Sequence, residues 1–374
     1  MKILHISKYY PPYRGGIEDV CYNIVCALHD KKQKVICFNN SPKDETSTIN
    51  NVEIIRIGKR IDFKSQPISI RYYYKLKEII REYQPDIIHL HLPNPLICLY
   101  VSLLIQPYTK LIVHWHSDII AQKYIYPLIS PIEKKILSRA DSIWVTSPQY
   151  LENSIPLLQY KKKAIVVPNP ISLEKLQMAK EDYDKVYQIK EQYSPKQIVF
   201  FMGRHVEYKG IEYLIEAEKY IKSDCIILIA GQGPLTQHLK NITKSSRIKY
   251  IGKIADEEIK IYMHAASVFA FPSITKNEAF GVVLAEAMYC KAVPVCFTIK
   301  GSGVNWVNIN NKTGIEIENK NAIAFAKAID DLLINEELRF KLGEQAKQRV
   351  VNMFTMKTIA KQINNIYKEL QNGN

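Results

Sequence analysis

Two glutamates eight positions apart, Glu278 and Glu286, flank a glycine and an apolar run in KNEAFGVVLAEAM (276–288). The pattern predicts a strand that ends near Ser273 and a helix that starts near Gly281. The first free amides of a helix bind anions such as a diphosphate, and Glu286 would lie about 7.5 Å along the helix axis. A ligand laid across this helix start could therefore meet one carboxylate at each end, with phosphates in between.

The two glutamates also have a simpler interpretation. Glu278 could be a solvated residue near a helix N-terminus, where negative charge is favourable. Glu286 is harder to explain in this way, because a glutamate within VVLAEAM needs a partner if it is buried. On that ground we favour the ligand-binding interpretation.

Two cations lie in FMGRHVEYKG (201–210), where Arg204 follows a predicted strand and Lys209 precedes Gly210 at a predicted helix start. Cations at the carboxyl end of a strand are well placed to neutralise a diphosphate. The alternative is a pair of surface charges. The segment alone fits both interpretations equally, and the glutamate-flanked helix start favours the first.

Gly15 and Gly16, in PPYRGGIEDV (11–20), stand between the first predicted strand and a helix. Glycines at this place let a phosphate or a sugar approach the backbone, although a simple turn explains them nearly as well. The segment is not a Gly-x-Gly-x-x-Gly motif, and nothing in the chain matches the Gly-x4-Gly-Lys-Ser/Thr phosphate loop.

Two histidine pairs, His89-x-His91 and His114-x-His116, lie on predicted strands. Alternate residues of a strand share a face, so four imidazoles could gather as a metal site. No acidic residue accompanies the first pair at ligand spacing, and aliphatic cores accept hydrogen-bonded histidines, so we favour the core interpretation. His116 differs, because it falls at the end of its strand, where ligands bind in a parallel sheet.

Asp182-Tyr183-Asp184 fits the Asp-x-Asp pattern that holds a metal–diphosphate in many sugar transferases. It lies in a charged segment away from any predicted strand end. We interpret it as a coincidence.

The elements that must position these residues alternate along the whole chain. Short β-rich runs such as KILHIS (2–7) and IVFFMG (198–203) alternate with amphipathic segments such as 17–31 and 256–266. This alternation predicts parallel sheets covered on both faces, and its repetition predicts two Rossmann-like halves. The polar segment 171–194 is the predicted linker between them. Two such domains facing each other would form a cleft, which is where a site belongs.

Composition limits the possibilities further. A chain of 374 residues favours two domains, and the net charge of +14 favours an anionic partner: nucleic acid, a phosphorylated small molecule or a membrane surface. The seven cysteines form no Cys-x-x-Cys pair and mostly sit in apolar runs, as in a reducing compartment. The longest apolar stretch, 96–105, is too short for a bilayer, which needs about 20 residues. We expect a soluble cytosolic protein that can touch a membrane.

One segment, 56–81, concentrates positive charge, with a net +6 over 26 residues. Its basic residues are Arg56, Lys59, Arg60, Lys64, Arg71, Lys75, Lys77 and Arg81. Apolar residues at helical spacing from Tyr72 to Tyr83 predict an amphipathic helix. The segment fits a helix that covers the sheet with solvated charges outside, and it fits equally well a surface that meets anionic lipid.

Taken together, these motifs resemble glycosyltransferase family 4, whose members are retaining enzymes with the GT-B fold. The Glu278-AFGVVLA-Glu286 segment is similar to the family's Glu-x7-Glu motif, and GGIE (15–18), VHWHSDI (113–119), VPNPI (167–171), GRHVEYKG (203–210) and GQGP (231–234) follow the family's order. The resemblance covers nearly the whole chain. It is greatest to bacterial mannosyl- and related transferases that build O-antigen or capsular polysaccharide.

The resemblance implies a GT-B fold of two Rossmann-like domains, 1–170 and 195–354, facing a central cleft, with the last helix, 355–374, crossing back to the first domain. It also implies roles for single residues. Glu286 would bind the donor's ribose; Arg204, Lys209 and the backbone around Phe280, Gly281 and Val282 would hold the diphosphate; and the base would rest near Lys253 and Ile254. Glu278 and His116 would contact the transferred sugar, and Gly15 and Gly16 would leave room on the opposite wall.

The implied function is transfer of a hexose from a nucleotide sugar, with GDP-mannose favoured and UDP-hexoses open, to a glycan on polyprenyl diphosphate at the cytoplasmic membrane face. The family needs no metal or other cofactor. The leading alternative is a sugar-nucleotide 2-epimerase, which would convert the donor without an acceptor. The +14 charge also permits a nucleic-acid binder, although no recognition motif supports it. We expect Glu278→Ala or Arg204→Ala to abolish transfer with little change in the thermal midpoint.

Overall fold

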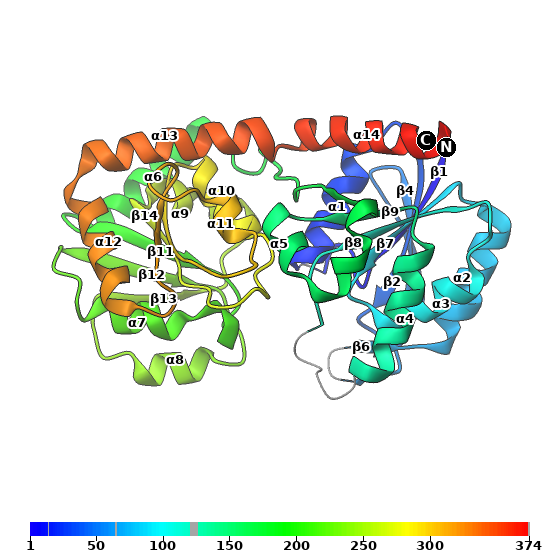
Figure 1. Ribbon diagram of the computed structural model, residues 1–374. Coiled ribbons are helices and arrows are strands. Elements are labelled where there is room, and N and C mark those ends of the chain that lie inside the picture. Colours follow the sequence, from blue (N-terminus) through cyan, green and yellow to red (C-terminus); the bar gives the residue numbers. More distant parts are fainter. Residues whose placement is uncertain (14, 64–65, 120–125, 373–374) are drawn as a thin grey trace. The chain divides into compact units, whose positions relative to one another are not determined.

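The computed structural model describes residues 1–13, 15–63, 66–119 and 126–372 (Figure 1). The chain divides into two compact units. Unit 1 comprises Met1–Pro170 and Met356–Asn374, and unit 2 comprises Ile171–Thr355.

Unit 1 is built on an eight-stranded sheet with the order β10-β9-β8-β7-β1-β2-β4-β3. These strands are β1 (Lys2–Ile6), β2 (Lys32–Asn39), β3 (Glu45–Ile49), β4 (Val52–Gly58), β7 (Ile87–Leu92), β8 (Lys110–Trp115), β9 (Ser142–Val145) and β10 (Ala164–Val166). A small hairpin of β5 (Ile61–Phe63) and β6 (Gln66–Ile68) is separate from this sheet. All neighbours in the large sheet are parallel except β3, which runs antiparallel to β4. The sequence did not predict β3, because this edge strand (ETSTI) is polar and largely exposed.

The helices of unit 1 follow the predicted alternation. They are α1 (Gly16–Ala27), α2 (Ile70–Tyr83), α3 (Pro95–Leu104), α4 (Tyr126–Arg139), α5 (Pro148–Asn153), the 3-10 helix η1 (Ile155–Lys163) and α14 (Met356–Asn372). Helix α1 packs against α14, and α3 packs against both α2 and α4 (Figure 1). In the described part of the chain no helix is both long and apolar enough to cross a membrane.

Unit 2 is built on a six-stranded, fully parallel sheet with the order β13-β12-β11-β14-β15-β16. The strands are β11 (Gln197–Met202), β12 (Cys225–Ala230), β13 (Ile248–Gly252), β14 (Val268–Phe271), β15 (Val293–Phe297) and β16 (Ile315–Ile317). The helices are α6 (Lys180–Tyr193), the 3-10 turn η2 (Glu207–Lys209), α7 (Ile211–Glu218), α8 (Thr236–Ile242), α9 (Asp256–Ala265), α10 (Val282–Tyr289), α11 (Val304–Val307), α12 (Ala322–Ile334) and α13 (Glu336–Met353).

The predicted linker, 171–194, is wrong in its character, because this segment belongs to unit 2 and holds helix α6. Asp182 accepts a hydrogen bond from the Ala179 amide and pairs with Lys260 of α9, so it caps α6 and joins it to the neighbouring helix. The helix was missed in the sequence because α6 is highly charged and buries few residues, so its apolar periodicity is weak. The interpretation of the Asp-x-Asp pattern as a coincidence agrees with this structural use of Asp182.

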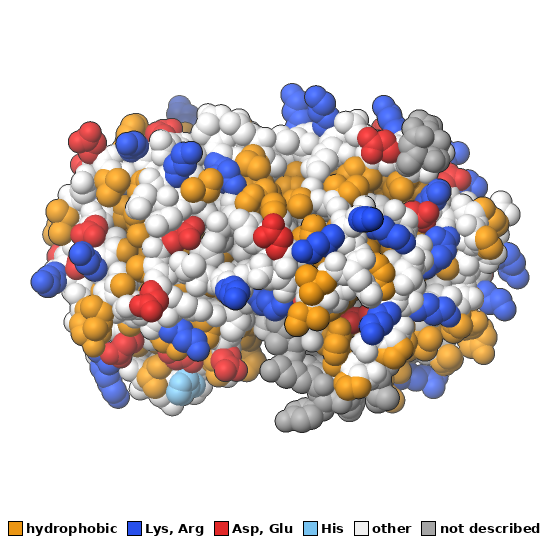
Figure 2. Space-filling model, viewed as in Figure 1, with side chains coloured by type: hydrophobic (Ala, Val, Ile, Leu, Met, Phe, Trp, Pro, Cys, Tyr) orange, Lys and Arg blue, Asp and Glu red, His pale blue; other side chains and the backbone are white. Residues whose placement is uncertain are grey.

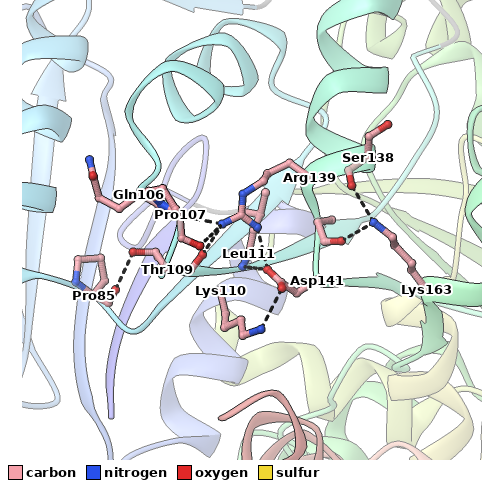
Figure 3. A network of polar contacts seen from close by, with 11 residues as sticks. Pro85, Gln106, Pro107, Thr109, Lys110, Leu111, Ser138, Arg139, Asp141 and Lys163 are labelled. Carbon is pink, nitrogen blue, oxygen red and sulfur yellow. Dashed lines mark hydrogen bonds and ion pairs between the residues drawn. The ribbon is translucent and has the colours of Figure 1, made fainter. Parts of the chain in front are cut away.

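A polar network fixes the amino ends of β8 and β9 in unit 1 (Figure 3). Arg139, the last residue of α4, donates to the carbonyls of Gln106, Pro107 and Thr109 and to the Asp141 carboxylate. Asp141 also accepts from the Leu111 amide at 2.8 Å. This network occupies the edge of the sheet opposite to the one where ligands bind, so we assign it a structural role.

Candidate functional site

The strand order of unit 2 brings the two strongest sequence motifs together. From β11 the chain runs outward through β12 and β13, then returns to the other side of β11 to form β14. The carboxyl ends of β11 and β14 are therefore neighbours at a topological switch point, where open parallel sheets bind ligands. Arg204 and Lys209 follow β11, and Glu278 and Gly281 follow β14.

Lys209 and Glu278 form a largely buried ion pair, with side chains only 9% and 12% exposed. The ammonium donates to the Glu278 carboxylate, which also accepts from the Ser273 hydroxyl at 3.4 Å. Burial alone would lower the pKa of Lys209, but the Glu278 carboxylate raises it above its ordinary value. Lys209 thus stays charged, and since Glu278 is its one hydrogen-bond acceptor among the described residues, two of its three N–H groups can meet a ligand.

Two glycines with positive φ shape this edge. Gly210 has φ +61°, and a Cβ there would lie 2.2 Å from the Pro272 carbonyl oxygen, so only glycine lets the turn after β11 pass so close to the end of β14. Gly281 has φ +85° and immediately precedes α10. The first amides of α10 have no acceptor within the helix, which leaves them available to an anion.

The residues around Gly281 are placed differently from one another. Phe280 is buried in the core of unit 2, with its ring 5.4 Å from that of Phe354, so only its backbone can meet a ligand. Val282 and Glu286 are half-buried on one face of α10. Glu286 is therefore not fully buried: the apolar run covers the other face of α10, and Glu286 lies beside it.

The remaining predicted residues of unit 2 lie along the same carboxyl edge. Arg204 is exposed, and no ion pair of Arg204 is found among the described residues. Lys253 is exposed after the last residue of β13, and Ile254 packs against the core. Gly231, at the end of β12, lies so close to Gly203 that a Cβ would meet the Gly203 carbonyl oxygen at 1.9 Å, which locks two strand-end loops together.

Unit 1 has its own switch point, between β1 and β7. Gly15 is the N-cap of α1 and Gly16 is its first residue, and a Cβ added at Gly16 would meet no atom within 4 Å, so the glycine leaves open space at the helix start. His116 follows β8 directly and is 5% exposed. Its ring nitrogen Nε2 lies 3.0 Å from Nδ1 of His91.

The predicted histidine pairs do gather, and His5 of β1 joins them, a residue that the sequence did not single out. Five buried histidines (His5, His89, His91, His114 and His116) form a row that we call the histidine ladder. Burial lowers the pKa of each, to about 4 for His5 and about 3 for His116. The ladder is therefore neutral at physiological pH.

The ladder does not suit the metal site that the pairs also suggested. A metal bound to imidazole lies in the ring plane, along a nitrogen lone pair. The rings of His89 and His91 are nearly parallel, at 14°, with centroids 4.6 Å apart, so they lie above one another and no ion can sit in both planes. The ligand atoms of His89, His91 and His114 lie within 4.8 Å of one another, but this ring stacking opposes a shared ion. The same spacing holds for His5, Cys21 and His91, where burial raises the pKa of the Cys21 thiol well above its ordinary value, which opposes ion binding.

Two surface hollows lie away from these residues. One, of about 450 Å³, is lined by residues of α7 and of 318–323 in unit 2. The other, of about 710 Å³, lies at the amino ends of β1 and β7 in unit 1. Since parallel sheets bind ligands at their carboxyl ends, we assign neither hollow to the site.

Two parallel α/β units with charged and glycine-rich strand ends at their switch points are typical of GT-B glycosyltransferases, and solved structures agree. Sucrose-phosphate synthase from Thermosynechococcus elongatus matches with a TM-score of 0.81 at 23% identity, covering 100% of both chains. HepE of Anabaena, in complex with UDP-glucose, matches with a TM-score of 0.79 at 17% identity over 99% of this chain and 100% of its own. These likenesses confirm the predicted fold.

Family comparisons then identify the chain more closely. Residues 14–175 match the model of "Glycosyltransferase Family 4", and residues 182–349 match that of "Glycosyl transferases group 1". The chain therefore belongs to the glycosyltransferases that combine these two domains. It is 29% identical to the O-antigen chain mannosyltransferase C of Escherichia coli, over 99% of both chains, and 27% identical to the D-rhamnosyltransferase WbpZ of Pseudomonas aeruginosa, over 95% of this chain and 92% of that one.

Proposed function

We propose that this protein is a retaining hexosyltransferase that moves a hexose from a nucleoside diphosphate sugar to a growing cell-surface glycan. The observation that carries the proposal is the buried Lys209–Glu278 pair beside Arg204 and the Gly281-led helix, at the switch point of unit 2. Cations and free amides suit a diphosphate, and a carboxylate suits sugar hydroxyls. The O-antigen mannosyltransferase and rhamnosyltransferase relatives support the substrate class.

In this proposal the charges of unit 2 stabilise the leaving group. The bond between the sugar's C1 and the diphosphate oxygen breaks, and the electron pair stays on the diphosphate. Lys209, Arg204 and the first amides of α10 stabilise that charge as it develops. Because Glu278 already holds Lys209 in place, the ammonium needs no reorganisation when the charge appears.

Retention follows if the acceptor attacks from the face that the diphosphate leaves. The acceptor oxygen forms its bond to C1 on that face, and its proton passes to the departing phosphate. Glu278 then positions sugar hydroxyls, and neutral His116 donates a hydrogen bond to the sugar. Glu286 binds the ribose, and the base rests near Lys253 and Ile254.

The donor is the first property to test. A thermal-shift panel of GDP- and UDP-sugars should show the largest stabilisation with one nucleotide sugar, for which GDP-mannose is our first candidate. Transfer to a polyprenyl-diphosphate-linked glycan should then require that donor. Conversion of the donor without any acceptor would instead identify a sugar-nucleotide 2-epimerase, and no shift with any nucleotide sugar would refute the proposal.

We further propose that transfer needs no metal ion, because Lys209, Arg204 and the helix start supply the positive charge that a metal supplies elsewhere. Incubation with EDTA should leave the transfer rate unchanged. Loss of activity with EDTA that is restored by Mg²⁺ would contradict this part of the proposal.

The acceptor, if it is lipid-linked, requires contact with a membrane, and α2 of unit 1 offers a suitable surface. Ile70 and Tyr74 are 62% and 65% exposed, and Lys77 and Arg81 continue the same exposed stripe at helical spacing. The opposite face of α2 is buried in the core. Figure 2 shows Lys and Arg side chains beside hydrophobic ones over the part of unit 1 that holds α2 to α4.

The basic segment 56–81 contributes less to this surface than the sequence suggested. Arg56 is 2% exposed and donates to Ser47 and to the Pro11 carbonyl, so it is a core residue. Arg71 donates to the Pro42 and Gly58 carbonyls, and Lys75 pairs with Glu78. Lys64 lies outside the described residues.

The membrane proposal is therefore best tested with the α2 stripe. Tyr74→Ser with Lys77→Glu should reduce sedimentation with anionic liposomes while leaving turnover of a soluble acceptor analogue unchanged. Lys327→Glu, on α12 of unit 2, makes a matched charge reversal elsewhere and should have no effect on sedimentation. Equal liposome binding by the α2 variant and the unaltered protein would refute the membrane contact.

A further inference from the structure

The histidine ladder places a second histidine, His91, against the predicted catalytic histidine, His116. The two ring planes are nearly parallel, at 9°, with centroids 5.3 Å apart and the facing nitrogens only 3.0 Å apart, so the rings meet edge to edge through these nitrogens. This geometry is that of a straight N–H···N hydrogen bond lying in both ring planes. One of the two nitrogens must carry the proton, so each ring fixes the tautomer of the other.

The neighbours of the pair decide which nitrogen is the donor. Nε2 of His91 is buried and has no partner among the described residues. If His91 accepted the hydrogen bond, its proton would be on Nε2, and a buried N–H would be left unpaired. An unpaired buried N–H is rarer in native structures than an under-used acceptor. His91 therefore carries its proton on Nδ1 and donates to Nε2 of His116.

The same logic applies to His5 in the ladder. The side-chain amide nitrogen of Gln33 donates to the carbonyls of Val25 and Leu28, which turns the Gln33 oxygen toward Nε2 of His5 at 2.9 Å. His5 must therefore carry its proton on Nε2, which leaves a bare Nδ1 and no unpaired N–H. His5 and His91 can thus each avoid a buried unpaired donor, whereas His114, whose two ring nitrogens are both buried without a partner among the described residues, cannot.

Two further contacts hold the His116 ring. Its backbone amide donates to the Leu92 carbonyl at 3.1 Å, and its ring lies against that of His114, with centroids 4.1 Å apart. Within the described ranges of the chain, the bond from His91 is the one side-chain contact that determines where the proton of His116 sits. With Nε2 accepting, His116 must present Nδ1–H.

We propose that His91 is a positioning residue that holds His116 as the Nδ1–H tautomer, so that His116 offers a donor, and not an acceptor, to the transferred sugar. This inference rests on the proposed function, because hexosyl transfer is the reaction in which His116 donates this hydrogen bond. His91 itself does not contact substrate in this proposal.

Two substitutions at His91 separate its hydrogen bond from its bulk. In His91→Asn the side-chain amide nitrogen can take the place of Nδ1 and keep the hydrogen bond to His116. In His91→Gln the amide falls near the position of Nε2, and the hydrogen bond to His116 is lost. We expect His91→Gln to lower kcat roughly 10- to 100-fold with little change in the KM for the nucleotide sugar, because a misoriented His116 costs about that much. His91→Asn should retain most of the turnover.

His89 is the matched control, since it lies two residues away on the same strand, is equally buried and bonds to Tyr367 rather than to His116. His89→Gln should lower the thermal midpoint as His91→Gln does, with kcat unchanged. If His89→Gln and His91→Gln lower kcat equally, or if His91→Gln turns over at the rate of the unaltered protein, the proposal is overturned.

A spectroscopic measurement separates this proposal from the proposed function. Long-range ¹H–¹⁵N correlation spectra of the imidazoles should assign Nδ1–H to His116 in the unaltered protein and in His91→Asn, and lose that assignment in His91→Gln. An Nε2–H tautomer for His116 in the unaltered protein would overturn the positioning role whatever the activity. The expected tautomer in a protein that transfers no sugar would retain the hydrogen-bond assignment and refute the proposed function.

Discussion

Units 1 and 2 share a parallel sheet with a switch point, but they place their polar groups differently. Unit 1 buries five neutral histidines within its sheet and beside Trp144 and Tyr367. In unit 2 the corresponding strands are filled with aliphatic and aromatic side chains such as Phe200, Phe201 and Phe269. Its polar groups are permanent charges that come after the strands end, above all Lys209 and Glu278.

This difference assigns a different chemistry to each unit. A neutral donor and acceptor network can position hydroxyl groups but contributes little to a diphosphate, whereas fixed cations at a strand end stabilise one strongly. Unit 1 should therefore respond to pH and to the loss of single hydrogen bonds. Unit 2 should respond to the loss of single charges.

Acid gives the largest expected effect. The ladder histidines have pKa values below the ordinary value in the folded protein, so between about pH 6.5 and 4 only the unfolded chain takes up their protons, and stability falls as pH falls. Each contributes about 1.4 kcal/mol per pH unit in this range. Burial raises the pKa of Glu133 to about 7 and also raises that of Glu18, which acts in the opposite direction and offsets one to two of the histidines. The net loss for unit 1 is roughly 4 to 6 kcal/mol per pH unit.

Tryptophan fluorescence can follow each unit separately, because Trp115 and Trp144 lie in unit 1 and Trp306 in unit 2. In the variant Trp306→Phe the two remaining tryptophans report on unit 1. In the double variant Trp115→Phe with Trp144→Phe the remaining Trp306 reports on unit 2. The urea midpoint of unit 1 should drop far more between about pH 7.5 and 5.5 than that of unit 2, where His205 and His264 are the histidines with a lowered pKa. Equal drops would contradict the comparison.

Removal of Glu278 gives the next largest effect. The sequence suggested that Glu278→Ala would leave the thermal midpoint nearly unchanged, but the structure alters this expectation, since the substitution leaves the buried Lys209 ammonium without its partner. We expect a loss of roughly 3 to 5 kcal/mol in the free energy of unfolding. The exposed pair Lys291–Glu344 is the matched control, and Glu344→Ala should cost less than about 1 kcal/mol. A similar loss in both variants, measured by urea unfolding, would show that the buried pair stabilises the fold no more than the exposed pair does.

Arg204→Ala separates activity from stability. Arg204 is exposed, so its removal should change the free energy of unfolding by less than about 0.5 kcal/mol. The kcat/KM for transfer should fall roughly 100- to 1000-fold, which corresponds to about 3 to 4 kcal/mol of lost transition-state stabilisation. Lys219→Ala, which removes an exposed cation of the same unit, should leave kcat/KM unchanged. Near-normal transfer by Arg204→Ala would show that Arg204 does not bind the diphosphate.

Tyr367→Phe tests the smallest effect. It deletes the hydroxyl that bonds Nδ1 of His89 at 2.8 Å and leaves that nitrogen unpaired. We expect unit 1 to lose about 1 to 2 kcal/mol, with unit 2 and kcat unaffected. A fall in kcat as large as that expected for His91→Gln would mean that the whole ladder, and not the His91–His116 bond, supports the reaction.

Much of the fold could be predicted because its determinants are local. A window of about 10 residues is enough to recognise the apolar runs of β1, β7, β11 and β14, the glycine before α10 and the amphipathic pattern of α2. The period of two along a strand also predicted that His89 and His91 share a face, as do His114 and His116. The edge strand β3 and helix α6 were missed, because polar residues conceal elements that bury little apolar surface.

The sequence by itself thus determined the alternation of strands and helices, the two Rossmann-like halves and the residues that stand at strand ends. Only the tertiary structure decided which of these residues meet. Lys209 and Glu278 are 69 residues apart, and they pair because β14 returns to the side of β11. His91 and His116 are 25 residues apart, and they bond because β7 and β8 are neighbours in register. Strand order depends on the packing of the whole sheet, so no local pattern could have supplied these contacts.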